Sequence, residues 1–336
     1  METAMPSSTS NSSDRLTGKL DLRAWILGFV IILACELSAR ALGYRPRLTD
    51  SEEIWAEQRA RVSQFDGNTV ALIGTSRMQV DIDPKELAPY FPGKPVVMLA
   101  IAGRRPLAAL EDLAEDATFR GVVICDIDPS WMLPKNWNDQ RPYIDFYKTH
   151  LSAVAWIKLQ LHLAIVPLKN FCFLHEQFSL ARLIRGPAYR DYVFMRRDRF
   201  VEAQFDRVGS DLARLQKNDK LADHDDGTGT FLSPKEMESH YSKVEACVKA
   251  LYKKGGRVIF VRMPTSGKRW ESNQRTVPKP LYWDNFAART QATCIHFKDY
   301  ASLSGFDCPD TSHLDYRDSA RFTKALGELI AREVRR

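Results

Sequence analysis

Short runs of apolar and β-branched residues recur along most of the chain, and segments with helical spacing separate them. The runs are TVALIG (69–74), PVVMLAIAG (95–103), GVVICDID (121–128), GRVIFVRMP (256–264) and TCIHF (293–297). Helical patterns such as PLAALEDLAED and SKVEACVKALYKKGG lie between most runs, and DSEEIWAEQRARVSQF predicts a helix before the first. Near-continuous apolar strands that alternate with helices indicate a parallel sheet covered on both faces. The sequence therefore predicts an α/β domain with a doubly wound, five-stranded parallel sheet.

The N-terminal part of the chain has a different pattern. Residues 1–22 form a polar tail rich in Ser and Thr, and residues 23–44 contain an unbroken apolar run from Ala24 to Cys35. This segment is just long enough to cross a bilayer, so it predicts a transmembrane anchor. An export signal is one alternative, because Ala39-Arg40-Ala41 resembles a cleavage site, and a buried helix of a soluble protein is another. Arg40, Arg45 and Arg47 balance the basic residues on the N-terminal side, so the orientation stays open, and we expect export of residues 45–336.

The third and fourth predicted strands are much farther apart than one crossover helix requires. Residues from about 130 to 232 are rich in aromatic residues and arginine, and they predict an insertion made mostly of helices and loops. An insertion at the carboxyl end of a strand can cover a functional site. A surface elaboration and a membrane-facing patch are alternatives that the pattern leaves open.

The composition is that of a globular protein, with 44% hydrophobic and 27% charged residues. A net charge of +6 is modest for 336 residues, and basic residues alternate with acidic ones, so we expect no nucleic-acid partner. The sequence has no Cys-x-x-Cys or His-Glu-x-x-His pattern and no glycine-rich nucleotide fingerprint after a predicted strand. We therefore expect neither a metal site nor a cofactor.

The folded part contains an odd number of cysteines, so at least one of them stays unpaired within a monomer. If the domain is exported, Cys294 and Cys308 can form a disulfide across a short loop. Buried free thiols are the simpler alternative.

The first predicted strand ends in Gly74-Thr75-Ser76-Arg77, a small turn that carries a hydroxyl group. In open parallel sheets, functional sites lie at the carboxyl ends of the strands, beside the point where the strand order reverses. With the common order 2-1-3-4-5, Ser76 lies at this point and can act as a nucleophile if a base is within hydrogen-bond reach. An ordinary turn is the simpler explanation, because Gly, Thr and Ser are frequent in turns.

A candidate base lies near the other end of the chain. Asp310 and His313 precede the last predicted helix. On a tight turn, the Asp310 carboxylate can fix the tautomer of the imidazole while the other ring nitrogen faces Ser76. Asp310 can instead be a helix cap, and His296 is expected to pack in the core of the fifth strand. Together, the two blocks predict a triad of Ser76, Asp310 and His313.

These blocks resemble those of the SGNH/GDSL hydrolase superfamily. In that family the nucleophilic serine follows the first strand in a G-[DTS]-S block, as in Gly74-Thr75-Ser76, and a D-x-x-H block precedes the last helix, as in Asp310 to His313. A glycine after the second strand supplies an oxyanion-hole amide in the family, and Gly103 has the matching position. The resemblance therefore implies an oxyanion hole formed by the backbone N–H groups of Ser76 and Gly103.

The chain departs from the family pattern after the third strand. Family hydrolases usually have an Asn there in a G-x-N-D block, whereas this chain continues as CDIDPSWMLPKNWND. Asn136 and Asn138 are the candidates that could reach the oxyanion site as a further donor. Loss of one oxyanion donor lowers turnover roughly a hundredfold to a thousandfold. The resemblance covers about residues 66–128 and 240–330 and leaves the insertion unmatched.

The resemblance implies a membrane-anchored serine esterase or O-acyltransferase that acts on acyl esters, chiefly acetyl esters, of a cell-envelope carbohydrate. In such a reaction Ser76 attacks the ester, His313 transfers the proton and Asp310 orients His313. Arg77 can contact an anionic substrate or pair with Asp128, and a solvated or structural arginine is the alternative. A non-catalytic membrane-tethered scaffold that binds an envelope polymer or a biosynthetic complex is the rival function. A phosphate-binding domain with the Gly-Thr-Ser turn as an anion nest is a third.

Overall fold

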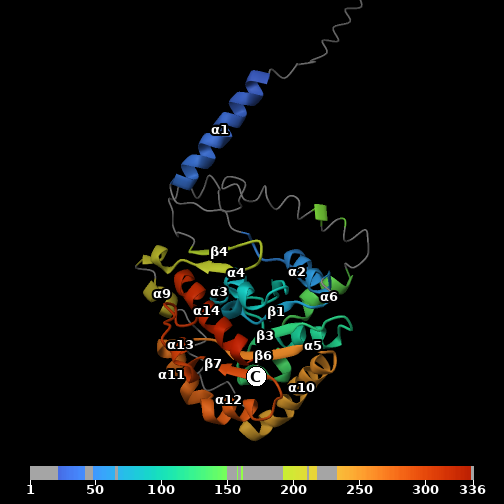
Figure 1. Cartoon of the computed structure of the whole chain (residues 1–336). Coiled ribbons are helices and arrows are strands. Elements are labelled where there is room, and N and C mark those ends of the chain that lie inside the picture. Colours follow the sequence, from blue (N-terminus) through green and yellow to red (C-terminus); the bar gives the residue numbers. More distant parts are fainter. Residues whose placement is uncertain are drawn as a thin grey trace, which may run out of the picture. The chain divides into compact units, whose positions relative to one another are not determined.

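Five parallel strands form the central sheet, in the order β2-β1-β3-β6-β7. Figure 1 labels β1, β3, β6 and β7 of this sheet. The structure is a computed structural model that describes residues 22–41, 48–64, 67–149, 157, 160–161, 192–209, 212–217 and 233–333. The strands are β1 (Val70–Ile73), β2 (Val96–Met98), β3 (Val122–Asp126), β6 (Arg257–Arg262) and β7 (Thr293–His296). Each lies within a predicted apolar run, and the predicted order 2-1-3-4-5 is confirmed. The order reverses at β1, the strand that leads to Ser76.

Different helices cover the two faces of the sheet, because side chains alternate along each strand. On β1, Ala71 and Ile73 point into one hydrophobic core, and Val70 and Leu72 point into the other. The first face packs against α2 (Glu52–Gln64), α5 (Leu107–Glu115), α6 (Arg141–Thr149), α10 (Pro234–Lys253) and α12 (Lys279–Ala287). The second face packs against α3 (Ser76–Asp81), α4 (Pro84–Leu87), α11 (Gly267–Thr276), α13 (Ala301–Ser304) and α14 (Tyr316–Glu333). The predicted doubly wound architecture is therefore present.

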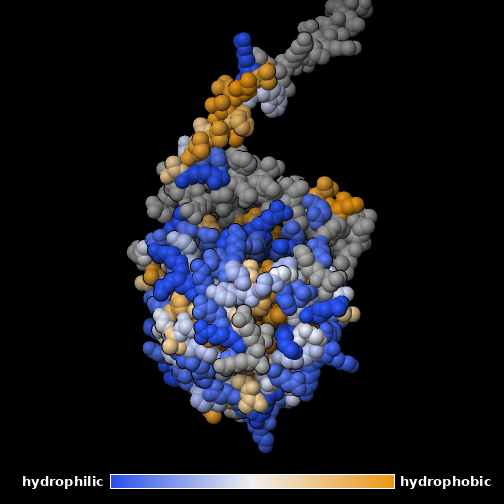
Figure 2. All heavy atoms as spheres, in the orientation of Figure 1, coloured by the Kyte–Doolittle hydropathy of each residue, from blue (hydrophilic) through white to orange (hydrophobic). Residues whose placement is uncertain are grey.

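The N-terminal segment belongs to a separate compact unit, Met1–Tyr44, whereas the sheet lies in the unit Arg45–Arg336. The described part of the first unit is α1 (Leu22–Ala41), and Figure 2 shows that apolar residues gather on it. Among the helices that the structure describes, none is sufficiently long and apolar to span a membrane. The prediction of a transmembrane helix is therefore not supported by the structure.

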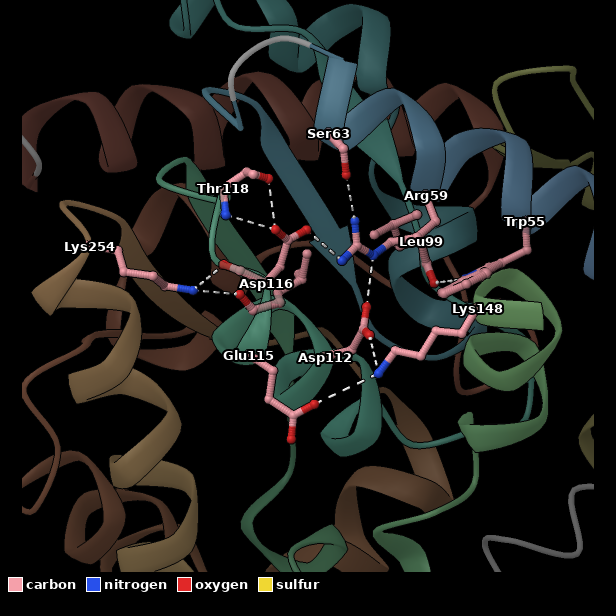
Figure 3. A network of polar contacts seen from close by, with 11 residues as sticks. Trp55, Arg59, Ser63, Leu99, Asp112, Glu115, Asp116, Thr118, Lys148 and Lys254 are labelled. Carbon is pink, nitrogen blue, oxygen red and sulfur yellow. Dashed lines mark hydrogen bonds and ion pairs between the residues drawn. The ribbon is translucent and has the colours of Figure 1, made fainter. Parts of the chain in front are cut away.

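A polar network joins the helices of the first face to one another and to β2 (Figure 3). Arg59 of α2 is buried and lies 2.8 Å from both Asp112 and Asp116 at the end of α5. Trp55 of α2 donates a hydrogen bond of 2.8 Å from Nε1 to the carbonyl of Leu99, which directly follows β2. Because a paired buried guanidinium has directional bonds, α2 is fixed in one position on the sheet. The carboxyl end of β2, where the loop toward the site begins, is thereby held in place.

The insertion between β3 and β6 differs from the prediction in its second half. Besides α6 and α9 (Leu212–Lys217), it contains an antiparallel hairpin of β4 (Val193–Met195) and β5 (Val201–Ala203) that was not predicted. Arg199 lies between the two strands with no exposed side-chain surface, and its guanidinium donates to the carboxylate of Asp50 and the carbonyl of Met98. These bonds dock the hairpin on the α/β core. Most of the predicted helical stretch, residues 162–191, lies outside the described residues.

The disulfide that the sequence allows is absent. Cys294 and Cys308 are both free thiols, as are the other cysteines that the structure describes, Cys35, Cys125 and Cys247. Cys294 packs against the core of the first face and Cys308 lies in the core of the second, so the sheet separates the two sulfur atoms. The alternative of buried free thiols is therefore correct for Cys308, and Cys294 is partly buried.

Candidate active site

Ser76, His313 and Asp310 come together at the carboxyl edge of the sheet. His313 Nε2 lies 2.8 Å from Ser76 Oγ, and His313 Nδ1 lies 2.8 Å from Asp310 Oδ2. Asp310 Oδ1 also accepts the backbone N–H groups of Ser312 at 3.0 Å and of His313 at 2.8 Å. With the Nδ1 proton directed at Asp310, Nε2 is free to accept the Ser76 proton. The structure thus places a serine, a base and an orienting carboxylate in one hydrogen-bonded chain, although the serine and the histidine are 237 residues apart.

The turn after β1 presents Ser76 because its two preceding residues have fixed roles. A Cβ atom at Gly74 would lie only 2.8 Å from the Asp126 side chain, so the close packing of this turn requires glycine. Thr75 caps α3: its hydroxyl donates to Asp126 Oδ2 at 2.9 Å and accepts the Arg77 N–H at 3.4 Å. Thr75 therefore supplies the capping bonds, which leaves the Ser76 hydroxyl available to the base.

The loop that carries His313 is bonded directly to α3, the helix that begins with Ser76. The backbone N–H of Leu314 donates to Asp81 Oδ1 at 2.9 Å. Five residues later, Ser319 Oγ donates to the carbonyl of Val80 at 2.9 Å. Because both acceptors lie at the end of α3, the distance between serine and histidine is set by hydrogen bonds between α3 and the start of α14.

Opposing effects act on the pKa values of the acid and the base. Burial alone lowers the pKa of His313, but the charge of Asp310 and its hydrogen bond, with a smaller effect of Asp81, raise it above its usual value. Burial alone raises the pKa of Asp310, but the imidazole and the hydrogen bonds to the carboxylate lower it. Asp310 therefore stays ionised where His313 titrates, as an orienting carboxylate must.

Two further carboxyl groups are fully buried beside the triad. Asp81 Oδ2 and Asp126 Oδ1 have no hydrogen-bond partner among the described residues. Burial raises the pKa of Asp81 to about 8, against the smaller lowering effects of His313 and Arg77. Burial also raises the pKa of Asp126. Burial therefore favours the protonated form of Asp81, whereas the charged imidazole of His313 favours the ionised form.

Gly103 lies in the exposed loop after β2, with a φ of +71° that favours glycine. The loop begins beside the nucleophile turn, because the Ile101 N–H donates to the carbonyl of Gly74 at 3.1 Å. Ser76 is the first residue of α3, so its N–H has no acceptor in a preceding helical turn. The structure thus ties the strand end before Gly103 to the turn before Ser76, as the predicted oxyanion hole requires.

Neither Asn136 nor Asn138 takes the place of the Asn that family hydrolases have after the third strand. Asn136 is buried and donates from Nδ2 to the carbonyl of Trp131 at 3.2 Å, and Asn138 lines a cavity away from the triad. Gln140, which the sequence motifs did not single out, reaches the site instead. It has no exposed surface, and its Nε2 donates to the carbonyl of Gly74 at 3.0 Å. No local signal marks Gln140, because its role depends on where α6 lies in the fold.

Arg77 is buried behind the nucleophile, and its Cζ lies 4.7 Å from the centroid of the Trp131 ring. Asp128 forms an ion pair of 3.0 Å with Arg262. Burial alone would raise the pKa of Asp128, but the charge of Arg262, with a smaller effect of Arg77, lowers it, so Arg77 acts on Asp128 by its charge. Direct contact of Arg77 with a substrate stays a prediction. The expectation for His296 is confirmed: it is buried, stacks on a neighbouring phenyl ring, and burial lowers its pKa to about 3.

Within the part of the chain that the structure describes, no cluster of His, Cys, Asp and Glu side chains could hold a metal ion. No protein-family model matches the sequence, and a search of curated proteins finds no similar one.

Proposed function

We propose that this chain is a serine ester hydrolase or O-acyltransferase of the SGNH type. The observation that carries the proposal is the hydrogen-bonded chain from Ser76 through His313 to Asp310, with both contacts at 2.8 Å. A serine hydroxyl is a weak nucleophile at neutral pH and needs an adjacent, oriented base. These three residues lie where the strand order of the sheet reverses, which is the usual place for a functional site in open parallel sheets.

In the proposed reaction, Ser76 Oγ forms a bond to the carbonyl carbon of an ester while its proton passes to His313 Nε2. Negative charge then develops on the carbonyl oxygen, where the N–H groups of Ser76 and Gly103 stabilise it. The carbon–oxygen bond to the alcohol breaks, and His313 returns the proton to the leaving alcohol. Asp310 keeps the imidazole oriented and stabilises its charged form.

The resulting acyl-serine is then released by a second transfer. A water molecule or a sugar hydroxyl loses its proton to His313 Nε2 and attacks the acyl carbon, and Ser76 leaves with the proton that His313 returns. Attack by water gives an esterase, and attack by a hydroxyl gives an acyltransferase. From the resemblance of the Ser and D-x-x-H blocks, we propose that the acyl group is small, chiefly acetyl, and that the substrate is a cell-envelope carbohydrate.

Export of the domain is part of the same proposal. The helix α1 exposes a series of large apolar side chains that need an apolar environment: Leu22, Trp25, Ile26, Leu27, Phe29, Val30, Ile31, Ile32, Leu33 and Leu37. We propose that this helix directs the domain to a membrane or serves as an export signal. Cell fractionation, with the mass of the mature chain, tests this: a full-length chain in the cytoplasm would contradict it.

The proposal is tested on the unmutated protein and on Ser76→Ala, with a fluorophosphonate probe and an acetyl ester. We expect labelling and turnover in the unmutated protein and neither in Ser76→Ala, because the Ser76 hydroxyl lies 2.8 Å from His313 Nε2. Ser312→Ala is the matched control, since Ser312 lies in the loop of the base, and it should keep both activities.

A folded, unmutated protein that neither labels nor turns over would contradict the proposal. The second candidate, a non-catalytic scaffold that binds an envelope polymer or a biosynthetic partner, would then be preferred. Its supporting observation is that the buried Asn136 binds a backbone carbonyl and does not face the triad as a further donor.

A further inference from the structure

One buried side chain joins the two pieces of chain that carry the proposed oxyanion amides. Gln140 lies just before α6, has no exposed surface, and directs its amide nitrogen at two backbone carbonyls. Nε2 is 3.0 Å from the carbonyl oxygen of Gly74, in the nucleophile turn, and 3.2 Å from that of Arg104, in the loop after β2. Ser76 follows Gly74 by two residues, and Gly103 directly precedes Arg104.

The residue beside Gln140 holds the same loop. The backbone carbonyl of Asp139 accepts a hydrogen bond of 2.8 Å from Arg104 Nη1. Its carboxylate accepts the N–H of Arg105 at 3.3 Å and lies 3.1 Å from Arg105 Nη1. Asp139 and Gln140 therefore fix the chain directly after Gly103 by several partly buried bonds. Gln140 adds a fully buried bond to Gly74 in the turn before Ser76.

Gly103 depends on such support more than the other members of the site do. It has no side chain, it is exposed, and its φ of +71° places it in the left-handed region. A hole for a developing oxyanion needs its donors in place before the charge forms, and a misplacement of about 1 Å can cost a hundredfold in rate. The direction of the Gly103 N–H is set by the residues on either side, and Gln140 holds one of these sides.

We propose that Gln140 is a positioning residue that sets the oxyanion hole, an inference that rests on the proposed esterase or acyltransferase function. Gln140 cannot itself be the missing third donor, because a carboxamide has two N–H protons and both face backbone carbonyls. It acts on the two amide donors through Gly74 and Arg104. The insertion thereby contributes to the proposed reaction without contacting the ester.

The test compares Gln140→Met with Asn136→Leu in the full chain. Methionine keeps the length of the side chain but cannot donate, whereas Asn136 is a buried amide of the same segment that donates away from the site. For an acetyl ester, we expect Gln140→Met to lower kcat roughly 10- to 100-fold, with KM changed less than about twofold. Labelling by a fluorophosphonate should slow similarly. Asn136→Leu should change kcat less than about threefold.

The pH profile separates this role from a general disturbance. The hydrogen bonds from Ser76 to His313 and from His313 to Asp310 do not involve Gln140. The acid limb of kcat/KM should therefore stay at the same pH in Gln140→Met. Full kcat in a folded Gln140→Met, an equal loss in Asn136→Leu, or a shifted acid limb would each overturn the inference. If Gln140→Met does not fold, Gln140→Asn replaces it: its shorter amide should lose part of the rate, and full rate would overturn the inference. An inactive unmutated protein would overturn the proposed function itself.

Discussion

The two sides of the proposed active site are built differently. On the acid–base side, each group has a hydrogen-bond partner of its own. Asp310 bonds to His313, His313 bonds to Ser76, and Asp81 accepts the N–H of Leu314, which follows His313. On the oxyanion side, Gly103 is exposed, has no side chain, and relies on bonds made by its neighbours. The first side is held by contacts within the triad loops, and the second by a segment of the insertion.

This difference leads to different expectations for substitutions. The acid–base side contains the groups that titrate, so changes there should alter the pH dependence of the reaction. The oxyanion side consists of backbone N–H groups that do not titrate, so changes there should lower the rate equally at all pH values. The pH profile therefore tells on which side a substitution acts.

Asp310→Asn should have the largest effect of the substitutions that keep the nucleophile. An amide at this position can leave the imidazole in the wrong tautomer, so we expect kcat to fall roughly a thousandfold to ten-thousandfold. Asp310 raises the pKa of His313, so its loss should lower that pKa and move the acid limb of kcat/KM to lower pH. The residual rate measured from about pH 5 to 9 tests this. An acid limb at its original position would place the control of the pH dependence outside Asp310.

Gly103→Ala should have a smaller effect with no change in the shape of the pH profile. An added Cβ would meet no atom within 4 Å, so the penalty comes from the φ of +71°. Alanine disfavours a positive φ, so we expect the backbone to rotate and to change the direction of the N–H group at this position. We expect kcat to fall about tenfold. Gly93→Ala is the matched control, since Gly93 has a φ of +76° and lies outside the site. A Cβ added at Gly93 would also meet no atom within 4 Å. Equal losses in both variants would show general destabilisation.

The sequence predicted one side of the site better than the other, for a physical reason. The strands were evident because parallel strands buried on both faces are continuous apolar runs. The triad was evident because Ser76 and the D-x-x-H block each have local patterns, and the fold brings strand ends together. Gln140 has no such pattern: it works through backbone carbonyls of two distant loops, so only its position in space reveals it.

The hairpin of β4 and β5 was missed for a similar reason. Each strand has three residues, and the segment between them is rich in charge, so neither apolar alternation nor length indicates a strand. Its position depends on ion pairs with the α/β core, such as the partly buried pair of Arg196 with Asp83 at 2.6 Å. Such a pair is specified by a partner 113 residues away, which no local pattern can show.

Asp81→Asn should have the smallest effect on the reaction and a clear effect on stability. Asparagine keeps an oxygen to accept the Leu314 N–H, and near neutral pH it resembles the protonated carboxyl that burial favours. We therefore expect kcat at pH 7 to change less than about threefold, because the distance between Ser76 and His313 is preserved.

The effect on stability should depend on pH. The pKa of Asp81 is about 8 in the folded chain and 3.8 in the absence of burial, so between these values the folded state binds more protons than the unfolded state. The contribution of Asp81 to the free energy of unfolding is present below about pH 4 and is lost as the pH rises through about 8. Asparagine does not titrate, so the Tm of Asp81→Asn relative to the unmutated protein should increase from pH 5 to pH 8. Asp284→Asn, an exposed control, should show a constant difference. A constant difference in Asp81→Asn as well would mean that Asp81 is ionised in the fold and acts on the imidazole of His313 as a second anion besides Asp310.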